Sequence, residues 1–202
     1  MLNRTKYGVD VDGFNDAPLS DDTAFLDEVK DFIQVDYAGD DTLIYKLYLT
    51  ALAYLDGNAG IANRSLIYSV WDYTLACFPC DEITLPLSPT VKVLAVSYRD
   101  TDGNTQQLVE GTDCRVNRLG AQNHRAQIVP LTSWPSVERG GDAVTISYVA
   151  GYSQTPSGLP ETVKTVIKCL VAEWHTNRTP NGAIPESPAF TGLLSSIRFT
   201  EI

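Results

Sequence analysis

The sequence predicts an α+β fold in which a small helical bundle carries an inserted antiparallel β module. Apolar residues recur at helical spacing near both ends of the chain, whereas residues 66–149 show the alternation typical of strands. Turn-forming residues divide this middle part into about six short segments, as in a small antiparallel sheet or sandwich. With 202 residues, 44% of them hydrophobic, the chain can bury a main core and a smaller second one.

Two amphipathic helices are predicted before residue 60. Ser20, followed by Asp21 and Asp22, suits the start of the first, because a hydroxyl caps free amides and acids favour the positive end of the helix dipole. Its apolar face contains Phe25, Leu26, Val29, Phe32 and Ile33. The second helix follows Gly39, and its apolar face contains Ile44, Leu47, Tyr48, Ala51 and Leu55. We expect the two helices to pack as a hairpin.

A third helix is predicted after Pro160, a residue suited to the first helical position. Its apolar stripe consists of Val163, Val166, Ile167, Leu170, Val171 and Trp174. This stripe needs apolar partners, which the first two helices can supply. Residues 20–60 and 159–178 are therefore expected to form the helical bundle, with residues 61–158 as the inserted antiparallel β domain.

The strands of the β domain are predicted at residues 66–76, 91–99, 105–109, 114–116, 127–130 and 142–149. In the second of these, strict alternation places Val91 and Val93 on one face and Leu94 and Val96 on the other. Asp102 and Gly103 predict the tight turn that follows it.

The two ends of the chain lack a clear apolar period. Residues 1–19 are predicted to be an N-terminal arm, and residues 179–202 an extended C-terminal tail, because prolines and a glycine interrupt regular structure there. An apolar cluster around Leu193 and Leu194 ends the tail, and it can pack on its own domain or reach a neighbouring molecule.

The net charge of −10 is concentrated near the N-terminus, where residues 1–56 hold twelve acidic and four basic residues. Tight wrapping of nucleic acid requires the opposite sign, because phosphate neutralisation dominates that affinity. The acidic residues either form solvated helix faces or provide a surface that repels passing DNA or docks a basic partner.

No catalytic constellation is recognisable, and no cofactor or metal site is predicted. The sequence lacks the nucleophile-elbow, zinc-protease, P-loop and dinucleotide-binding motifs. His124 is expected at the surface and His175 at a helix end. No apolar run is long enough to span a membrane, and no signal peptide is evident, so synthesis in the cytoplasm is expected.

Two other functions remain open from these residues. Cys77 and Cys80 form a C-x-x-C motif that would serve a thiol oxidoreductase, although it contains Pro79 and lacks a following helix, and all four cysteines are expected to be buried or half-buried free thiols. Trp71 and Trp134 would serve a carbohydrate- or peptide-binding β module of a tail or surface protein, although core positions are more usual for such rings.

The chain also contains an ordered series of short motifs. They are Phe78-Pro79, ITLPLSP at 83–89, VKVLAVSY at 91–98, DTDGN at 100–104, Trp134-Pro135, VTISYVAGY at 144–152, Leu159-Pro160 and AEWHTNR at 172–178. In their order and spacing they resemble the head-tail connector (adaptor, or head-completion) proteins of tailed bacteriophages and phage-like particles. The resemblance runs from about residue 26 to residue 198 and so covers most of the chain.

This resemblance implies a structural virion protein and not an enzyme. Such proteins form a ring, usually twelve-fold, below the portal protein at the neck, and join the DNA-filled head to the stopper or tail-terminator protein. DNA passes through the ring without sequence-specific binding, and no membrane is involved. The C-terminal segment tends to contact the portal, which makes the candidate portal contacts Leu193, Leu194, Ile197, Arg198 and Phe199.

Overall fold

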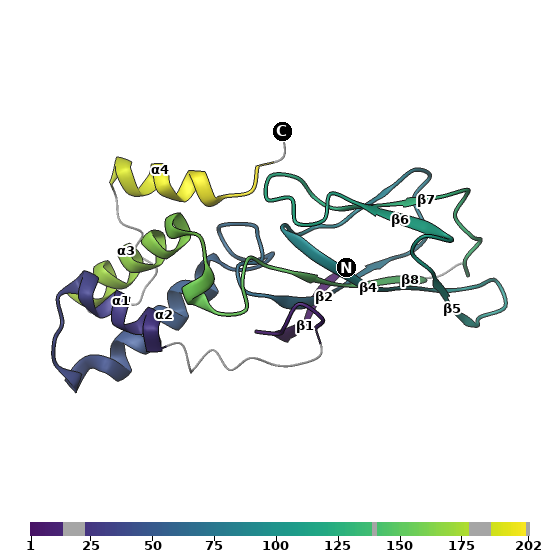
Figure 1. Ribbon diagram of the computed structural model, residues 1–202. Coiled ribbons are helices and arrows are strands. Elements are labelled where there is room, and N and C mark those ends of the chain that lie inside the picture. Colours follow the sequence, from purple (N-terminus) through teal and green to yellow (C-terminus); the bar gives the residue numbers. More distant parts are fainter. Residues whose placement is uncertain (14–22, 139–140, 178–186, 201–202) are drawn as a thin grey trace.

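The computed structural model describes residues 1–13, 23–138, 141–177 and 187–200, in which a helical bundle lies beside a β-sandwich (Figure 1). Helices α1 (Thr23–Ile33) and α2 (Asp41–Leu55) precede the main β segment in the chain. Helices α3 (Glu161–Asn177) and α4 (Pro188–Ile197) follow it. The predicted α+β class and the insertion of an antiparallel β module between helices are therefore confirmed.

Helix α3 lies at the centre of the bundle and contacts all three other helices. All six residues of its predicted apolar stripe are buried. Helix α4 lies on one side of α3, and α1 and α2 lie on the other (Figure 1). Phe25 of α1 and Tyr48 of α2 pack together in the same core, with ring centroids 5.3 Å apart. The predicted cap of α1 at Ser20 lies outside the described residues.

The β module consists of two antiparallel sheets. The larger has the strand order β1 (Leu2–Tyr7), β2 (Ser69–Leu75), β8 (Val144–Ala150), β4 (Thr90–Arg99) and β5 (Thr105–Leu108). The smaller has the order β3 (Ile83–Thr84), β7 (Gln127–Pro130) and β6 (Cys114–Asn117). A second core fills the space between the sheets, with Ile146 and Tyr148 from the larger and Ile83 and Ile128 from the smaller. The arrangement is a sandwich with a core separate from that of the bundle.

Strand β4 departs from the predicted strict alternation. Its pairing with β8 shifts register twice near the start of the strand. Each β-bulge inserts one residue, so the side chains that follow move to the other face. Val93 and Val96 therefore both pack in the core between the sheets, whereas Val91 and Leu94 pack on the opposite face. The predicted division of these four residues is wrong for that reason.

The first part of the predicted N-terminal arm is a strand. Residues Leu2–Tyr7 form β1, which pairs with β2 at an edge of the larger sheet. Only Leu2, Arg4 and Tyr7 of this strand are half-buried, and the rest of it is exposed. An edge strand that is covered over so little of its surface shows no clear apolar period, which is why the sequence did not predict it.

The predicted extended tail contains helix α4. The hydroxyl of Ser187 accepts a hydrogen bond from the amide of Phe190 at 3.1 Å, and Pro188 occupies the first turn. Phe190 and Ile197 are buried in the core of the bundle. The expectation of an extended segment is therefore wrong over residues 188–197, because a proline that ends one element can also begin a helix.

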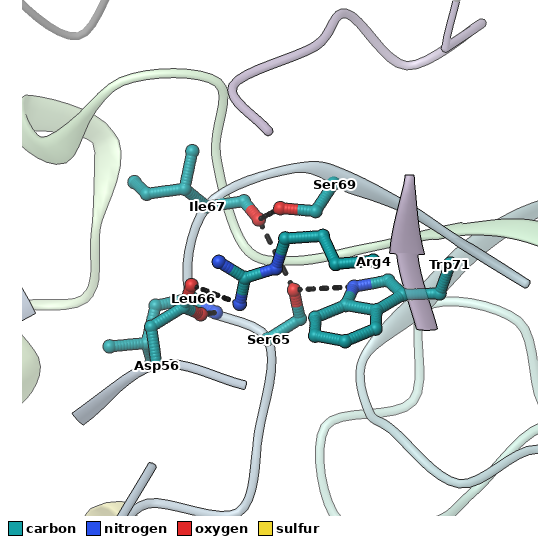
Figure 2. Close-up of polar contacts among 7 residues, drawn as sticks. All are labelled: Arg4, Asp56, Ser65, Leu66, Ile67, Ser69 and Trp71. Atoms are coloured by element: carbon teal, nitrogen blue, oxygen red, sulfur yellow. Dashed lines mark hydrogen bonds and ion pairs between the residues drawn. The ribbon is translucent and has the colours of Figure 1, made fainter. Parts of the chain in front are cut away.

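A partly buried ion pair links the end of α2 to β1 and to the chain leaving the bundle (Figure 2). The side chain of Asp56 is fully buried. Its Oδ2 accepts a hydrogen bond from Arg4 Nη2 at 2.7 Å, and its Oδ1 accepts one from the Leu66 amide at 2.5 Å. Burial raises the pKa of Asp56, while Arg4 and the Leu66 amide favour its charged form and oppose that rise.

The same cluster fixes two aromatic rings. The Arg4 guanidinium lies over the rings of Tyr7 and Trp71, 4.6 Å and 4.5 Å from their centroids. The indole N–H of Trp71 donates to the hydroxyl of Ser65 at 3.2 Å (Figure 2). At Gly57, with φ of +85°, an added Cβ would lie 2.5 Å from Arg4 Nη2 and 3.1 Å from the Trp71 ring, so any other residue at this turn would be strained.

Ion pairs also tie α1 to α3. Glu28 accepts hydrogen bonds from Lys168 Nζ at 2.7 Å and from Lys164 Nζ at 3.5 Å. The Lys168 hydrogen bond, aided by the charge of Lys164, lowers the pKa of Glu28.

Among the described helices, none combines the length and apolar character that a membrane crossing requires.

We expect Arg4→Ala to lower the free energy of unfolding by about 3 kcal/mol, because the buried Asp56 carboxyl loses its cation. Urea unfolding followed by tryptophan fluorescence measures the change. Asn3→Ala, on the exposed part of the same strand, is the matched control and should be near neutral. Equal stability of the two variants would contradict a stabilising role for the ion pair.

We also expect Glu28→Gln to lose less unfolding free energy in acid than the wild type does. Because the pKa of Glu28 is lower in the folded chain than its ordinary value of 4.5, its contribution is present above that value. The contribution is lost as the pH falls through the lower folded pKa. Unfolding free energies measured between about pH 6 and about pH 3 should therefore fall less in Glu28→Gln than in the wild type. Asp31 is an exposed acid on α1, so Asp31→Asn is the control and should show the wild-type dependence of unfolding free energy on pH. The same pH dependence in Glu28→Gln would contradict a stabilising role for the ion pairs between α1 and α3.

Candidate functional site

The five candidate portal contacts lie together at the C-terminal end of α4 and just beyond it. Ile197 and Phe199 are buried within the chain itself. Leu193 and Leu194 are half-buried against the core of the bundle, and Arg198 is exposed. The structure therefore gathers these residues on one segment but turns most of their apolar surface inward.

Phe199 anchors this segment to the rest of the chain. Its amide donates to the carbonyl of Ala62 at 2.9 Å. Its ring contacts two guanidinium groups, those of Arg64 and Arg125, at 5.3 Å and 5.0 Å from the centroid. Cation–π attraction of this kind favours a fixed position of the ring.

Arg64 brings a positive charge into the interior. Only 5% of the residue is exposed. Its Nη1 donates to the hydroxyl of Tyr152 at 2.9 Å and to the carbonyl of Gln122. Its Nε is buried and has no hydrogen-bond partner among the described residues. Burial raises the pKa of Tyr152, and the neighbouring Arg64 opposes that rise.

A hollow of about 470 Å³ opens beside this segment. It is lined by Asn63, Arg125, Ser195, Arg198, Phe199 and Thr200. The two arginine side chains at this hollow, Arg125 and Arg198, can bind a carboxylate by charge-assisted hydrogen bonds. Arginine and aromatic residues are also enriched at protein interfaces. The hollow therefore suits a protein partner with an acidic side chain.

A second, more apolar groove of about 550 Å³ lies between α1, α3 and the start of α4. It is lined by Phe32, Cys169, Ala172, Glu173, Thr176, Asn177, Ser187, Ala189, Phe190 and Leu193. Phe32 is 48% exposed, although its place in the predicted stripe of α1 suggested a core position. It marks the edge of the bundle core.

The two tryptophans of the alternative binding module do not form a platform. Trp71 is buried beneath Arg4. Trp134 stacks on Phe78 with centroids 4.7 Å apart, and its indole N–H donates to the Asp81 carbonyl at 2.7 Å. Trp71 is therefore not available for a ligand, as a stacking platform requires.

The cysteines divide into two groups. Cys114 is buried and Cys169 is half-buried, as expected, and burial raises the pKa of both thiols. The same prediction is wrong for Cys77 and Cys80, which are exposed because they lie in the loop that leaves β2. This loop leads to β3 and not to a helix, so the dipole that activates such a thiol pair is missing.

The two histidines occupy the predicted positions, at the surface and at a helix end. His124 is exposed, and His175 lies in the last turn of α3 with Nε2 3.3 Å from Asp40 Oδ2. Asp100 is a turn residue, and hydrogen bonds led by that from Gln106 lower its pKa. Within the described part of the chain, no group of three or more His, Cys, Asp or Glu residues is placed to hold a metal ion.

Sequence reasoning did not identify Arg64 and Arg125 as neighbours of the candidate segment. Both lie more than seventy residues before Phe199 in the chain, so no local pattern links them to it. Only the packing of the segment against Ala62 brings them together.

Comparison with known structures shows that this fold occurs in phage-like particles. A chain in the neck of an empty gene transfer agent (GTA) particle, computed with C6 symmetry, is 23% identical with a TM-score of 0.71. A chain in the virion of a native GTA particle is 22% identical with a TM-score of 0.73. A third, in the neck of a native GTA particle with C12 symmetry, is 22% identical with a TM-score of 0.71.

In each comparison the match covers 100% of this chain and 97% of the other. The chain therefore has the fold of a component of GTA particles over its full length. No family model matches the sequence, and no curated protein does. The fold agrees with the resemblance to head-tail connector proteins.

We expect a thiol-reactive probe to label Cys77 and Cys80 rapidly in the folded protein. Cys169 should react more slowly, and Cys114 only after unfolding, because a buried thiol excludes the reagent and is less ionised. Mass spectrometry of timed samples locates each label. Early labelling of Cys114 would contradict its place between the two sheets, and the same reaction in denaturant is the control.

Proposed function

We propose that this chain is a head-tail connector (adaptor) protein, a structural component of the neck of a phage or phage-like particle. The observation that carries this proposal is the full-length fold similarity to chains of GTA particles, two of them from particle necks. The motif series along the chain supports the same class. The role is structural, so it requires no catalytic residue.

In this proposal, identical copies form a ring below the portal protein, with twelve copies in the particle. The ring joins the DNA-filled head to the stopper or tail-terminator protein at the head-tail interface. DNA passes through its lumen. The net charge of −10 suits this role, because an acidic protein does not hold DNA tightly during passage.

We further propose that the end of α4 contacts the portal. Arg198 and the accessible parts of Leu193 and Leu194 face outward and can meet the portal directly. Ile197 and Phe199 belong to the same contact segment, and their burial holds it against the chain. The hollow beside Arg198 offers a place for an acidic side chain of the portal.

The test mixes the protein with the portal ring from the same source and examines the product by negative-stain microscopy. We expect a new layer of density, with the symmetry of the portal, on one end of the ring. If both components are folded and no layer forms, the adaptor function is overturned.

Arg198→Glu is expected to weaken portal binding by about tenfold or more, because it places the wrong charge at the contact. The thermal midpoint should not change, since Arg198 is exposed. Lys46→Glu, an exposed change of the same charge on α2, is the control and should bind like the wild type. Unaltered binding by Arg198→Glu would contradict this location and would mean that the portal contact lies on another surface.

A further inference from the structure

The turn between α1 and α2 presents acidic and apolar side chains together. We define the hairpin tip as Asp31, Phe32, Asp36 and Tyr37, all of which are exposed. Phe32 and Tyr37 are 48% and 60% exposed, high values for rings of this size. No ion pair of the described residues involves Asp31 or Asp36. The tip is therefore both charged and partly apolar, which is typical of a surface that meets another protein.

The opposite composition occurs on β6 and the loop that follows it. Residues 114–137 hold three arginines, one histidine and no acidic residue, in a chain of net charge −10. We define the arginine patch as Arg115, Arg118, Leu119 and Arg125. Arg115 and Arg118 are exposed, and neither pairs with a carboxylate among the described residues. Leu119, which directly follows Arg118 in the chain, is 44% exposed.

The two surfaces lie at different ends of the molecule. The α1–α2 turn is at the lower left of Figure 1, whereas β6 and β7 are at the upper right. One copy therefore cannot bring its own hairpin tip onto its own arginine patch. A ring of identical copies, in contrast, needs two different complementary surfaces on each copy, because its interfaces are heterologous and head-to-tail.

We propose that the hairpin tip of one copy docks on the arginine patch of the next copy. This inference rests on the proposed ring function and specifies which surfaces close the ring. Asp31 and Asp36 pair with Arg115 and Arg118, while Phe32 and Tyr37 cover Leu119. Charge complementarity sets the register of the contact, and the apolar side chains exclude water from it.

A second copy fits the arginine patch better than DNA does. The exposed Leu119 has no partner on a phosphate backbone, whereas the rings of the hairpin tip can cover it. The net charge of the whole chain also opposes the approach of DNA. DNA binding is kept as an outcome of the test.

The test uses two charge-reversal variants of the full chain. The patch variant is Arg115→Glu with Arg118→Glu, and the tip variant is Asp31→Arg with Asp36→Arg. Each variant alone faces like charges at every interface with its own kind. An equal mixture of the two restores opposite charges at every interface in an alternating ring. Copies bound per portal ring are counted by native mass spectrometry.

We expect each variant alone to form incomplete rings, with the concentration for half-maximal assembly raised by about tenfold. The mixture should restore the wild-type copy number, and about threefold higher salt should weaken the wild-type ring. Asp102→Arg with Glu110→Arg, two exposed acids near β5, is the matched control and should assemble normally.

Complete rings from either variant alone, or no rescue by the mixture, would overturn the contact. Complete rings from a patch variant that has lost DNA retention in a gel-shift assay would assign the patch to DNA instead. If the wild-type chain does not bind the portal, the proposed function fails, but the contact between the hairpin tip and the arginine patch can still be tested without the portal. Sedimentation at low salt then shows association only for the wild type and the mixture if the contact is real, and equal behaviour of all samples if it is not.

Discussion

The rest of the structure depends on the burial of α3. This helix contacts α1, α2 and α4, and the six apolar residues of its stripe, from Val163 to Trp174, are all buried. Each of the other helices is amphipathic and short, so none is expected to be stable without that surface. Because α3 follows the β module in the chain, the bundle core cannot be completed until residues far apart in sequence have met. The module is consequently held at both ends by one helical core.

The ion pair of Asp56 determines how the two halves of the molecule join. Asp56 ends α2, Arg4 comes from the edge strand β1, and the Leu66 amide belongs to the chain that enters β2. A buried carboxylate is stable only with such partners, so the three segments are held in one relative position. The stacking of Arg4 on Trp71 extends this constraint into the β-sandwich. In the proposed ring, such a rigid junction keeps the outer surfaces of each copy at a constant spacing.

The surfaces proposed for assembly were accessible to sequence reasoning only in part. The apolar cluster at the C-terminus was visible in the sequence, but the packing of Phe199 against Ala62, Arg64 and Arg125 was not, since those contacts join distant segments. The acidic character of the N-terminal helices was equally visible. Which acids remain unpaired depends on whether a lysine lies opposite, as Lys168 does for Glu28 and as none does for Asp31.

The sequence by itself determined the fold class, the three main helices and most strands, because period 3.6 and period 2 are local properties of the chain. It also supplied the motif order that resembles head-tail connector proteins. Only the tertiary structure decided the strand β1 and the faces of β4, and it replaced part of the expected extended tail with the helix α4. An edge strand such as Leu2–Tyr7 carries few apolar residues, a helix such as Pro188–Ile197 follows chain-breaking residues, and the bulges near Val93 depend on pairing with β8. The strand β1 and the faces of β4 depend on pairing with residues distant in sequence, which no local period records. Helix α4 does have a local period in Phe190, Leu193, Leu194 and Ile197, but the prolines before it favoured an extended tail.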